Sequence, residues 1–295
     1  MSYFVDQCIN GLSLGTIYAL VALGFAMVYG VLRFLNFAHS EVFTAGAFIG
    51  DFVLRATLRV RPDEPAVAVT ITFMAAALGA GCLAMLIYAV AYRPLLGQPR
   101  LRMLLAAIGV SILLQDLGIQ LFSAHTQGYP PLTLPLAVAP RWLAVAVLLI
   151  SYATLQGIIY HTKAGINIRA VAENPDVAAL MGIKPLAWIY FPFFLGGAFA
   201  GIAGVTWGLV YGTVHPQMGF YPGMKAFIIA VAGGIGNLRG TFLMGILFGL
   251  LEVSVSSLLP STWSGLKDTA TFGILIAFLI WRPAGFMGTV QVPKV

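Results

Sequence analysis

The residues able to do chemistry in this sequence are a few polar side chains set in long apolar segments. Ionisable groups at membrane depth are costly, so they are candidates for lining a solute pathway or relaying protons. The densest group is the six-residue segment NFAHSE, at 36–41. The candidates for a translocation pathway are Asn36, His39, Glu41, Gln115 and Asp116.

A structural role competes with the pathway role at these positions. Asn36 or Ser40 would also serve as the cap of a helix that begins here, with Glu41 in its first turn. Gln115 would also serve as a hydrogen bond between helices. A further carboxylate, Glu252, lies in a late apolar segment and carries the same ambiguity.

Catalysis finds little support in the sequence. No nucleophile–base pair stands in the apolar segments, and the three histidines outside them show no metal-ligand spacing with one another. The two cysteines, Cys8 and Cys82, lie in apolar surroundings and offer neither a disulfide framework nor a metal motif. An intramembrane enzyme is therefore the least favoured class, and no metal site is expected.

The composition indicates an integral membrane protein. Of 295 residues, 60% are hydrophobic and only 9% are charged, whereas soluble domains carry roughly 25% charged residues. No basic stretch precedes the first apolar segment, so a cleavable signal peptide is not expected. The net charge of +6 comes from basic residues that stand singly in short loops, which argues against nucleic-acid binding.

The apolar segments predict the fold class. A full helical crossing takes about 20 residues, so the seventh segment is too short and is expected to be a half-helix, broken within GGIGNLRG at 233–240. We expect an all-α, polytopic bundle of eight or nine transmembrane segments in a single domain over 1–295. The helix-break candidates are Gly233, Gly234, Gly236 and Asn237. The segments are 9–32, 35–54, 66–91, 103–122, 141–160, 187–211, 224–236, 240–259 and 267–281.

Small residues recur every four positions in two of these segments. Such faces let helix backbones approach closely in lipid, where no hydrophobic force drives association. Several runs in one chain therefore predict a tightly packed bundle. The runs are Gly11–Gly15–Ala19, Ala22–Ala26–Gly30 and Gly196–Ala200–Gly204–Gly208–Gly212.

The distribution of Lys and Arg predicts the orientation. If all nine segments cross and the C-terminus is inside, the inside regions hold ten and the outside regions six of the sixteen basic residues. This bias places the loop at 161–186 and the C-terminus in the cytoplasm. The outside regions then include Lys225, the loop around Tyr129 and the segment HPQMGFYPG at 215–223.

The loop at 161–186 contains a short helix with well-defined ends. In RAVAENPDVAALMGI, at 169–183, Asn174 is a good N-cap and Pro175 suits the first helical position. Asp176 complements the positive end of the helix dipole, and Gly182 ends the helix. The pattern predicts a helix over 175–181.

One face of this helix is apolar, since helical spacing brings Val177, Leu180 and Met181 together. Lipid headgroups and a groove on a partner protein both fit such a face. Interfacial helices usually carry Lys and Arg on the polar side, whereas this segment carries two carboxylates beside one arginine, which favours a protein partner. The candidate contact residues are Arg169, Glu173, Asn174, Asp176, Val177, Leu180, Met181 and Gly182.

Three stretches resemble ABC importer permeases of the branched-chain amino-acid class. RAVAENPDVAALMGI is similar to that family's cytoplasmic coupling loop. The segment NGLSLGTIYALVALGFAMVYGVLRFLNFAHSEVFTAGAF, at 10–48, is similar to its N-terminal signature, and AVAGGIGNLRGTFLMGILFGLLE, at 230–252, to its C-terminal one. The length suits the LivH-type subunit. One departure is Ser40, where the family commonly has glycine, and it leaves the role of 36–41 open.

The resemblance implies a permease subunit that moves branched-chain or other small amino acids across a bacterial inner membrane by alternating access. It also implies two ATP-binding subunits docked on the coupling loop, a second related permease in a heterodimer, and a soluble solute-binding protein at the outer face. No GxxxxGK[ST] phosphate loop is present. ATP would therefore be used by the partner subunits, and no cofactor is expected on this chain.

An ion-coupled secondary transporter of small solutes is the alternative function. It would use buried carboxylates such as Glu41, Asp116 and Glu252, and it would need no ATPase. Transport that is abolished by an uncoupler and unaffected by loss of an ATPase would identify that class. The permease sequence does not fix the substrate, because selectivity can reside mainly in the binding protein.

Overall fold

The computed structural model describes residues 2–131 and 140–288, and most of them are helical. Strands β1 and β2 form one short antiparallel pair, with Gln127 opposite Val214. The elements in chain order are α1 (Ser2–Leu32), α2 (His39–Val60), α3 (Pro65–Ile87), the π-helical turn η1 (Tyr88–Tyr92), the 3₁₀ turn η2 (Arg93–Leu95), α4 (Arg100–Phe122), β1 (Gln127–Gly128), α5 (Pro140–His161), α6 (Lys163–Glu173), α7 (Pro175–Leu180), α8 (Pro185–Tyr211), β2 (Thr213–Val214), α9 (Phe220–Gly233), α10 (Leu238–Leu258), the 3₁₀ turn η3 (Ser261–Leu266) and α11 (Lys267–Trp281).

Each of the nine predicted apolar segments contains a helix, so the all-helical fold class is confirmed. Within the described residues, six helices are long and apolar enough to cross a membrane: α1, α3, α4, α5, α8 and α10. Helix α2 is long but carries several charges, and α9 and α11 have only 14 and 15 residues. The described residues therefore contain six helices with the length and apolar character of a membrane span, whereas eight or nine crossings were predicted.

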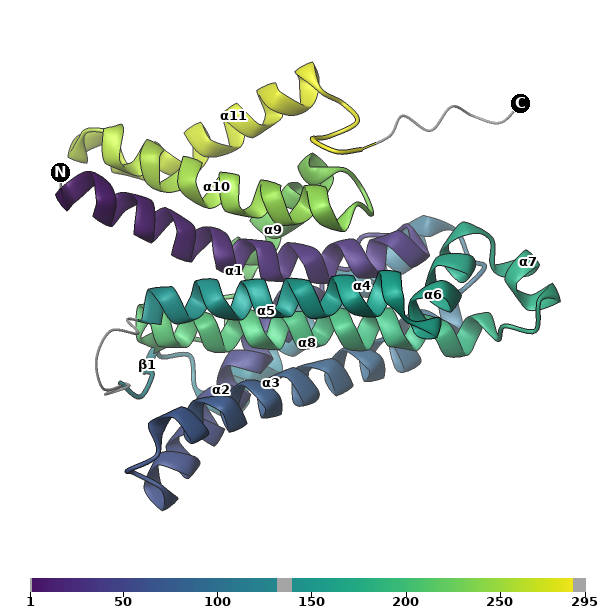
Figure 1. Ribbon diagram of the computed structural model, residues 1–295, viewed down its shortest axis with the longest axis horizontal. Coiled ribbons are helices and arrows are strands. Elements are labelled where there is room, and N and C mark those ends of the chain that lie inside the picture. The colour runs from purple at the N-terminus through teal and green to yellow at the C-terminus, as the bar shows by residue number, and fades with distance from the viewer. Residues whose placement is uncertain (1, 132–139, 289–295) are drawn as a thin grey trace.

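The long helices lie roughly side by side along the longest axis of the molecule (Figure 1). Helices α10 and α11 lie on one side of α1, and α2 and α3 lie on the far side of α8. Helices α6 and α7 stand at one end of the bundle, opposite to the end where α1 begins and β1 lies. The loop that carries the capped helix therefore projects from one face of the membrane domain.

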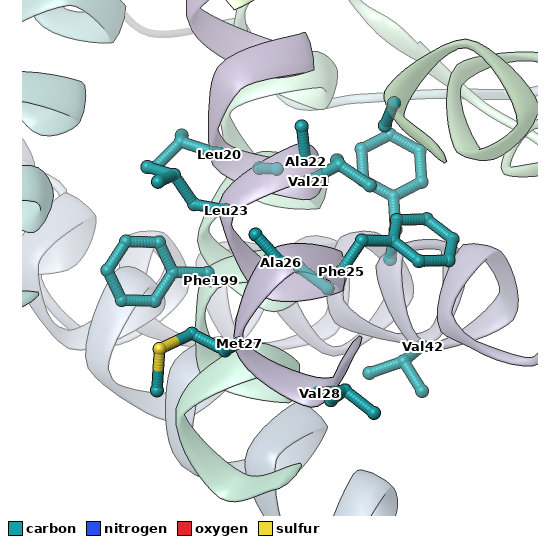
Figure 2. Packing of buried hydrophobic residues seen from close by; sticks show 14 of the residues in the cluster. Leu20, Val21, Ala22, Leu23, Phe25, Ala26, Met27, Val28, Val42 and Phe199 are labelled. Atoms are coloured by element: carbon teal, nitrogen blue, oxygen red, sulfur yellow. The ribbon is translucent and has the colours of Figure 1, made fainter. Parts of the chain in front are cut away.

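Helix α1 is the centre of the hydrophobic core. In its most apolar stretch 94% of the residues are buried, compared with 11% in α4. Figure 2 shows that its middle, from Leu20 to Val28, projects side chains all around the helix, with Val42 of α2 and Phe199 of α8 in the same cluster. A helix apolar on every side is expected to be enclosed by other helices.

The small-residue faces pack backbone against backbone, as predicted. A Cβ added to Gly245 of α10 would lie 2.6 Å from the Cα of Ala19, and one added to Gly196 of α8 would lie 2.9 Å from the carbonyl oxygen of Gly24. Both distances are too short for a carbon side chain. Glycine at these positions therefore lets α1 approach α8 and α10 closely, and the dispersion attraction between the close-packed backbones stabilises the bundle.

Helix α2 begins inside the bundle rather than at its edge. The His39 imidazole lies against Gly24 of α1, where an added Cβ would be 2.5 Å from Nε2. Gly24 precedes the last residue of α1 by about two helical turns. Residues 33–38 therefore fold back into the bundle, and the prediction of a segment from residue 35 set the start of this helix too early.

Helix α9 also begins inside the bundle, against the first turn of α2. An added Cβ on Gly219 would collide with the backbone and Thr44 hydroxyl of α2, and one on Gly223 would collide with the Ser40 side chain. Ser40, the departure from the family pattern, packs into the space that these two glycines leave. The first turns of two interrupted helices thus meet within the membrane domain.

We expect Gly245→Leu to disrupt the crossing of α1 and α10, because the new side chain would overlap Ala19. Thermal unfolding of the purified chain in detergent should shift to lower temperature. Gly273→Leu is the matched control, since nothing lies within 4 Å of the corresponding Cβ on α11. Equal stability of the two variants would contradict the close-packing argument.

Candidate translocation and coupling sites

Glu41, on the first turn of α2, is the centre of a polar cluster that links α2 to α4. Its Oε1 accepts hydrogen bonds from Gln115 Nε2 at 2.8 Å and from Ser111 Oγ at 3.3 Å. The Ser40 hydroxyl donates to the same oxygen at 3.3 Å. Glu41 itself is 3% exposed. The structure therefore brings together two of the predicted pathway residues, Glu41 and Gln115.

Asn36 and Ser40 do not cap α2, so the capping interpretation is wrong for both. The N-cap position is Ala38, and no side chain satisfies the free N–H groups there. Asn36 instead accepts a hydrogen bond of 2.6 Å from the Tyr92 hydroxyl, which ties the re-entrant segment 33–38 to the turn η1 that follows α3. The Ser40 hydroxyl also donates to the Phe37 carbonyl, at 2.7 Å.

His39 lies on the side of α2 that faces α1. Its ring meets the edge of Phe25 with centroids 4.6 Å apart, and it is 1% exposed. Neither ring nitrogen has a hydrogen-bond partner among the described residues. His39 is therefore surrounded like a residue of the hydrophobic core, and it takes no part in the hydrogen bonds around Glu41.

Asp116 lies on the exposed face of α4, one residue beyond Gln115. Its carboxylate accepts a hydrogen bond of 2.8 Å from Gln120 one turn later. Both side chains are exposed within an otherwise apolar helix that contributes little to the core. A carboxylate facing hydrocarbon is costly, so this face of α4 requires water or a polar partner.

An ionic network around the buried Lys225 joins four helices, and it was not predicted from the sequence; Glu252 is also buried, whereas the Asp268 side chain is 40% exposed. Lys225 Nζ of α9 lies 2.6 Å from Glu252 Oε1 of α10 and 3.0 Å from Asp268 Oδ1 of α11. Tyr18 of α1 donates its hydroxyl proton to Glu252 Oε2 at 2.9 Å and lies 3.2 Å from Lys225 Nζ.

Lys225 was counted among the basic residues of the outside regions, and the structure places its side chain in the interior of the bundle. Helix α9 starts four residues earlier than the predicted segment, and Lys225 is 5% exposed within it. The signal available in the sequence was the presence of Lys225, Glu252 and Asp268 in the last three apolar segments. Charges buried at membrane depth pair with one another, and these are the candidates for such pairing.

Tyr129 lies in a loop after β1, as predicted, but its side chain is not available for contact with a partner. This residue is 5% exposed, and its ring occupies the space beside Gly208 of α8. The segment 215–223 is loop only up to Gly219, after which α9 begins. Partial burial of the His215 imidazole in this loop lowers its pKa, so its neutral form is favoured at pH 7.

The predicted loop at 161–186 contains two helices, α6 and α7, where the sequence indicated one. Helix α6, which was not predicted from the sequence, begins after Thr162, whose hydroxyl accepts a hydrogen bond from the Gly165 N–H. Arg169 and Glu173 lie on α6. The Arg169 guanidinium donates to the Ile159 carbonyl at the end of α5 and stands 5.4 Å from the centre of the Tyr160 ring.

The capped helix α7 has the ends that the sequence indicated. The Asn174 side chain accepts from the N–H groups of Asp176 and Val177, at 3.0 and 3.2 Å. Pro175 is the first helical residue, and Gly182 follows the helix with φ of +80°, a conformation that favours glycine. Helix α7 ends at Leu180, one residue before the predicted end.

The apolar face of α7 is exposed at the end of the bundle. Leu180 is 86% exposed, Met181 78% and Val177 53%. Ala178, on the opposite side, is buried and anchors α7 to the domain. Large exposed apolar side chains that are grouped on a projecting helix are typical of a protein contact.

The helix break lies between α9 and α10. Gly233 is the last residue of α9, and Gly234 and Gly236 adopt φ of +107° and +78°, which bulky residues avoid. Asn237 then caps α10, accepting from the N–H groups of Arg239 and Gly240 at 3.1 Å each. The four helix-break candidates therefore form the turn that reverses the chain.

Comparison with known proteins identifies the family. Residues 7–281 match the family described as the branched-chain amino acid transport system / permease component. The permease protein LivH of Salmonella typhimurium, from a high-affinity branched-chain amino acid transport system, is 34% identical over 99% of this chain and 98% of its own. LivH of Escherichia coli K12 is equally similar, and BraD of Pseudomonas aeruginosa is 33% identical over the same shares.

The chain therefore belongs to this permease family, as the three sequence motifs indicated. It is a transport subunit with several membrane-spanning helices, of the LivH type.

We expect Lys225→Met to destabilise the chain by about 3–5 kcal/mol, because it leaves two carboxylates without their buried partner. Thermal unfolding in detergent measures the loss. The double variant Lys225→Met/Glu252→Gln should recover part of it, since the uncompensated buried charge is then removed. A single variant as stable as the native chain would contradict the role of the network.

Proposed function

We propose that this chain is the permease subunit of an ATP-driven importer for branched-chain or other small amino acids. The family membership supports the transport role, and the relatives named above are described as branched-chain amino acid permeases. Two ATP-binding subunits drive alternating access, and a solute-binding protein delivers the substrate to the outer face. The C-terminus and helices α6 and α7 face the cytoplasm.

The exposed apolar face of α7 is the observation that carries this proposal. A single turn and a half of helix, capped at Asn174 and held by the buried Ala178, presents Leu180 and Met181 away from the bundle. A groove on an ATP-binding subunit would cover this face. Because α7 follows α6 directly and leads directly into α8, movement of the docked subunit would be transmitted to a central helix of the core.

The polar residues on the exposed face of α4 are the observation that supports the presence of a second permease subunit. Most of α4 is exposed in the single chain, and its Asp116 and Gln120 need polar cover at membrane depth. A related but distinct permease placed against α4 would enclose these residues together with Gln115, and Glu41 lies directly behind them. The translocation pathway would then run between the two subunits along α4.

The ion-coupled alternative receives less support from the geometry. Glu252, one of the carboxylates that it would use, is held by Lys225 and by the Tyr18 hydroxyl. Both of its oxygens therefore form contacts between helices of the bundle, and neither faces a solute pathway along α4. A projecting apolar helix such as α7 also has no role in that mechanism.

We expect Leu180→Asp to abolish substrate uptake while membrane insertion of the chain remains normal. The substitution places a charge in the apolar contact with the ATP-binding subunit. Uptake in cells and co-purification of P-loop ATPases measure the effect, with Leu180→Met as the control that preserves the apolar surface. Normal uptake by Leu180→Asp would count against docking at α7.

We expect Glu41→Ala to slow uptake about tenfold or more, because it removes the acceptor of three hydrogen bonds that order Ser40, Ser111 and Gln115, each worth roughly 0.5–1.5 kcal/mol. Co-purification of the ATPases should be unchanged, since Glu41 lies on α2 and not on the coupling helices. Asp63→Ala, which removes an exposed carboxylate in the α2–α3 loop, is the control. Unchanged uptake by Glu41→Ala would remove this residue from the pathway.

A further inference from the structure

A large cavity lies where α1, α5, α6 and α10 come together at the end of the bundle that carries α7. Its volume is about 1020 Å³. Three arginines from separate parts of the chain line it: Arg33 just after α1, Arg169 on α6 and Arg239 on α10. Glu173 is the single acidic residue among its lining residues, so the cavity has an excess of positive charge.

The charges of these three arginines have no acidic partner in the part of the chain that the structure describes. Arg169 and Arg239 both stand over the ring of Tyr160, with guanidinium carbons 5.4 and 5.8 Å from its centre. Two cations gathered around one ring repel each other, and an anion placed between them would relieve this repulsion.

Other residues that line the cavity are apolar, or are of a type common at the boundary between lipid and water. Val231 and Ile235, from α9 and the turn after it, line the same space, and Ile235 is 56% exposed. Tyr29 and Tyr160 stand where apolar helices end, a position that tyrosine favours at the boundary between lipid and water. A ligand that fits both parts would combine an anionic group with an apolar chain.

From this arrangement we infer that the cavity binds the headgroup of an anionic phospholipid of the cytoplasmic leaflet. The phosphate lies among Arg33, Arg169 and Arg239, and the acyl chains leave past Ile235. Basic pockets between membrane helices on the cytoplasmic side are suited to such headgroups. The orientation of the site rests on the proposed function, but binding itself does not require the partner subunits.

This site would affect the coupling segment directly. Arg169 belongs to α6, and α6 is separated from α7 only by Asn174. A bound phosphate would hold α6 against the ends of α5 and α10 and thereby fix the position of the docking helix. An importer in a membrane without anionic lipid would then couple less well to its ATPases.

The test uses the purified full-length chain alone in detergent, with dioctanoyl-phosphatidylglycerol, dioctanoyl-phosphatidylcholine and inorganic phosphate as probes. Native mass spectrometry counts retained lipid, and thermal unfolding reports stabilisation. We expect stabilisation by phosphatidylglycerol only. An equal effect of phosphatidylcholine would overturn the charge argument, and an equal effect of inorganic phosphate would identify a free-anion site instead.

The variant Arg33→Gln/Arg169→Gln/Arg239→Gln should bind phosphatidylglycerol at least about tenfold more weakly, since each basic residue near an anionic headgroup contributes roughly fivefold. Arg33→Lys/Arg169→Lys/Arg239→Lys should retain most of the binding. Arg59→Gln/Arg61→Gln/Arg102→Gln removes the same charge outside the cavity and should bind normally. Undiminished binding by the first variant would overturn the proposal.

Addition of the ATP-binding subunits separates this inference from the proposed function. Lipid that remains bound in the assembled transporter supports the site. Displacement of lipid by the subunits would instead assign the arginines to a protein contact and overturn the lipid proposal. Uptake lost in Leu180→Asp but with lipid binding intact would show that the two sites act independently.

Discussion

Close approach of helix backbones around α1 is the constraint on which the rest of this structure depends. In lipid, burial of apolar side chains adds little to association, so helices must gain their stability from dense packing. Glycines on α8 and α10 bring backbone within van der Waals distance of α1, and the most apolar stretch of α1 is almost wholly enclosed as a result. A core fixed in this way allows peripheral elements such as α4 and α7 to expose surfaces for other subunits.

The meeting of α2 and α9 follows from the same dense packing. Each begins part of the way through the domain, and glycines before and within the first turn of α9 make room for Ser40. The re-entrant segment 33–38 is held in place by the hydrogen bond between Asn36 and Tyr92. Irregular backbone at membrane depth is tolerated only where protein or water covers it. Here protein covers it, and Glu41 extends from this point toward α4.

Much of the fold could be predicted from local signals in the sequence. Apolar length marks the helices, and Asn174, Pro175 and Gly182 set the ends of α7 because capping and positive φ depend on neighbouring residues alone. The small-residue runs likewise located the closest approaches between helices. These features require no knowledge of where distant segments lie.

The remaining features depend on contacts between distant segments, which one sequence does not specify. The ion pairs of Lys225 were not predicted, because its partners, Glu252 and Asp268, follow 27 and 43 residues later. Asn36 was considered a cap because its true partner, Tyr92, lies 56 residues away. Helix α6 was missed because its 11 residues lie outside the long apolar segments, although Ile168 and Val171, three residues apart, are both buried.

The network around Lys225 has a consequence for the way the protein is made. Helix α9 is short and carries a lysine, so its own transfer into hydrocarbon is unfavourable. The carboxylates that neutralise this lysine belong to α10 and α11, which leave the ribosome later. The last quarter of the chain must therefore enter the bilayer as a group, with α9 waiting beside the insertion machinery until α11 has been synthesised.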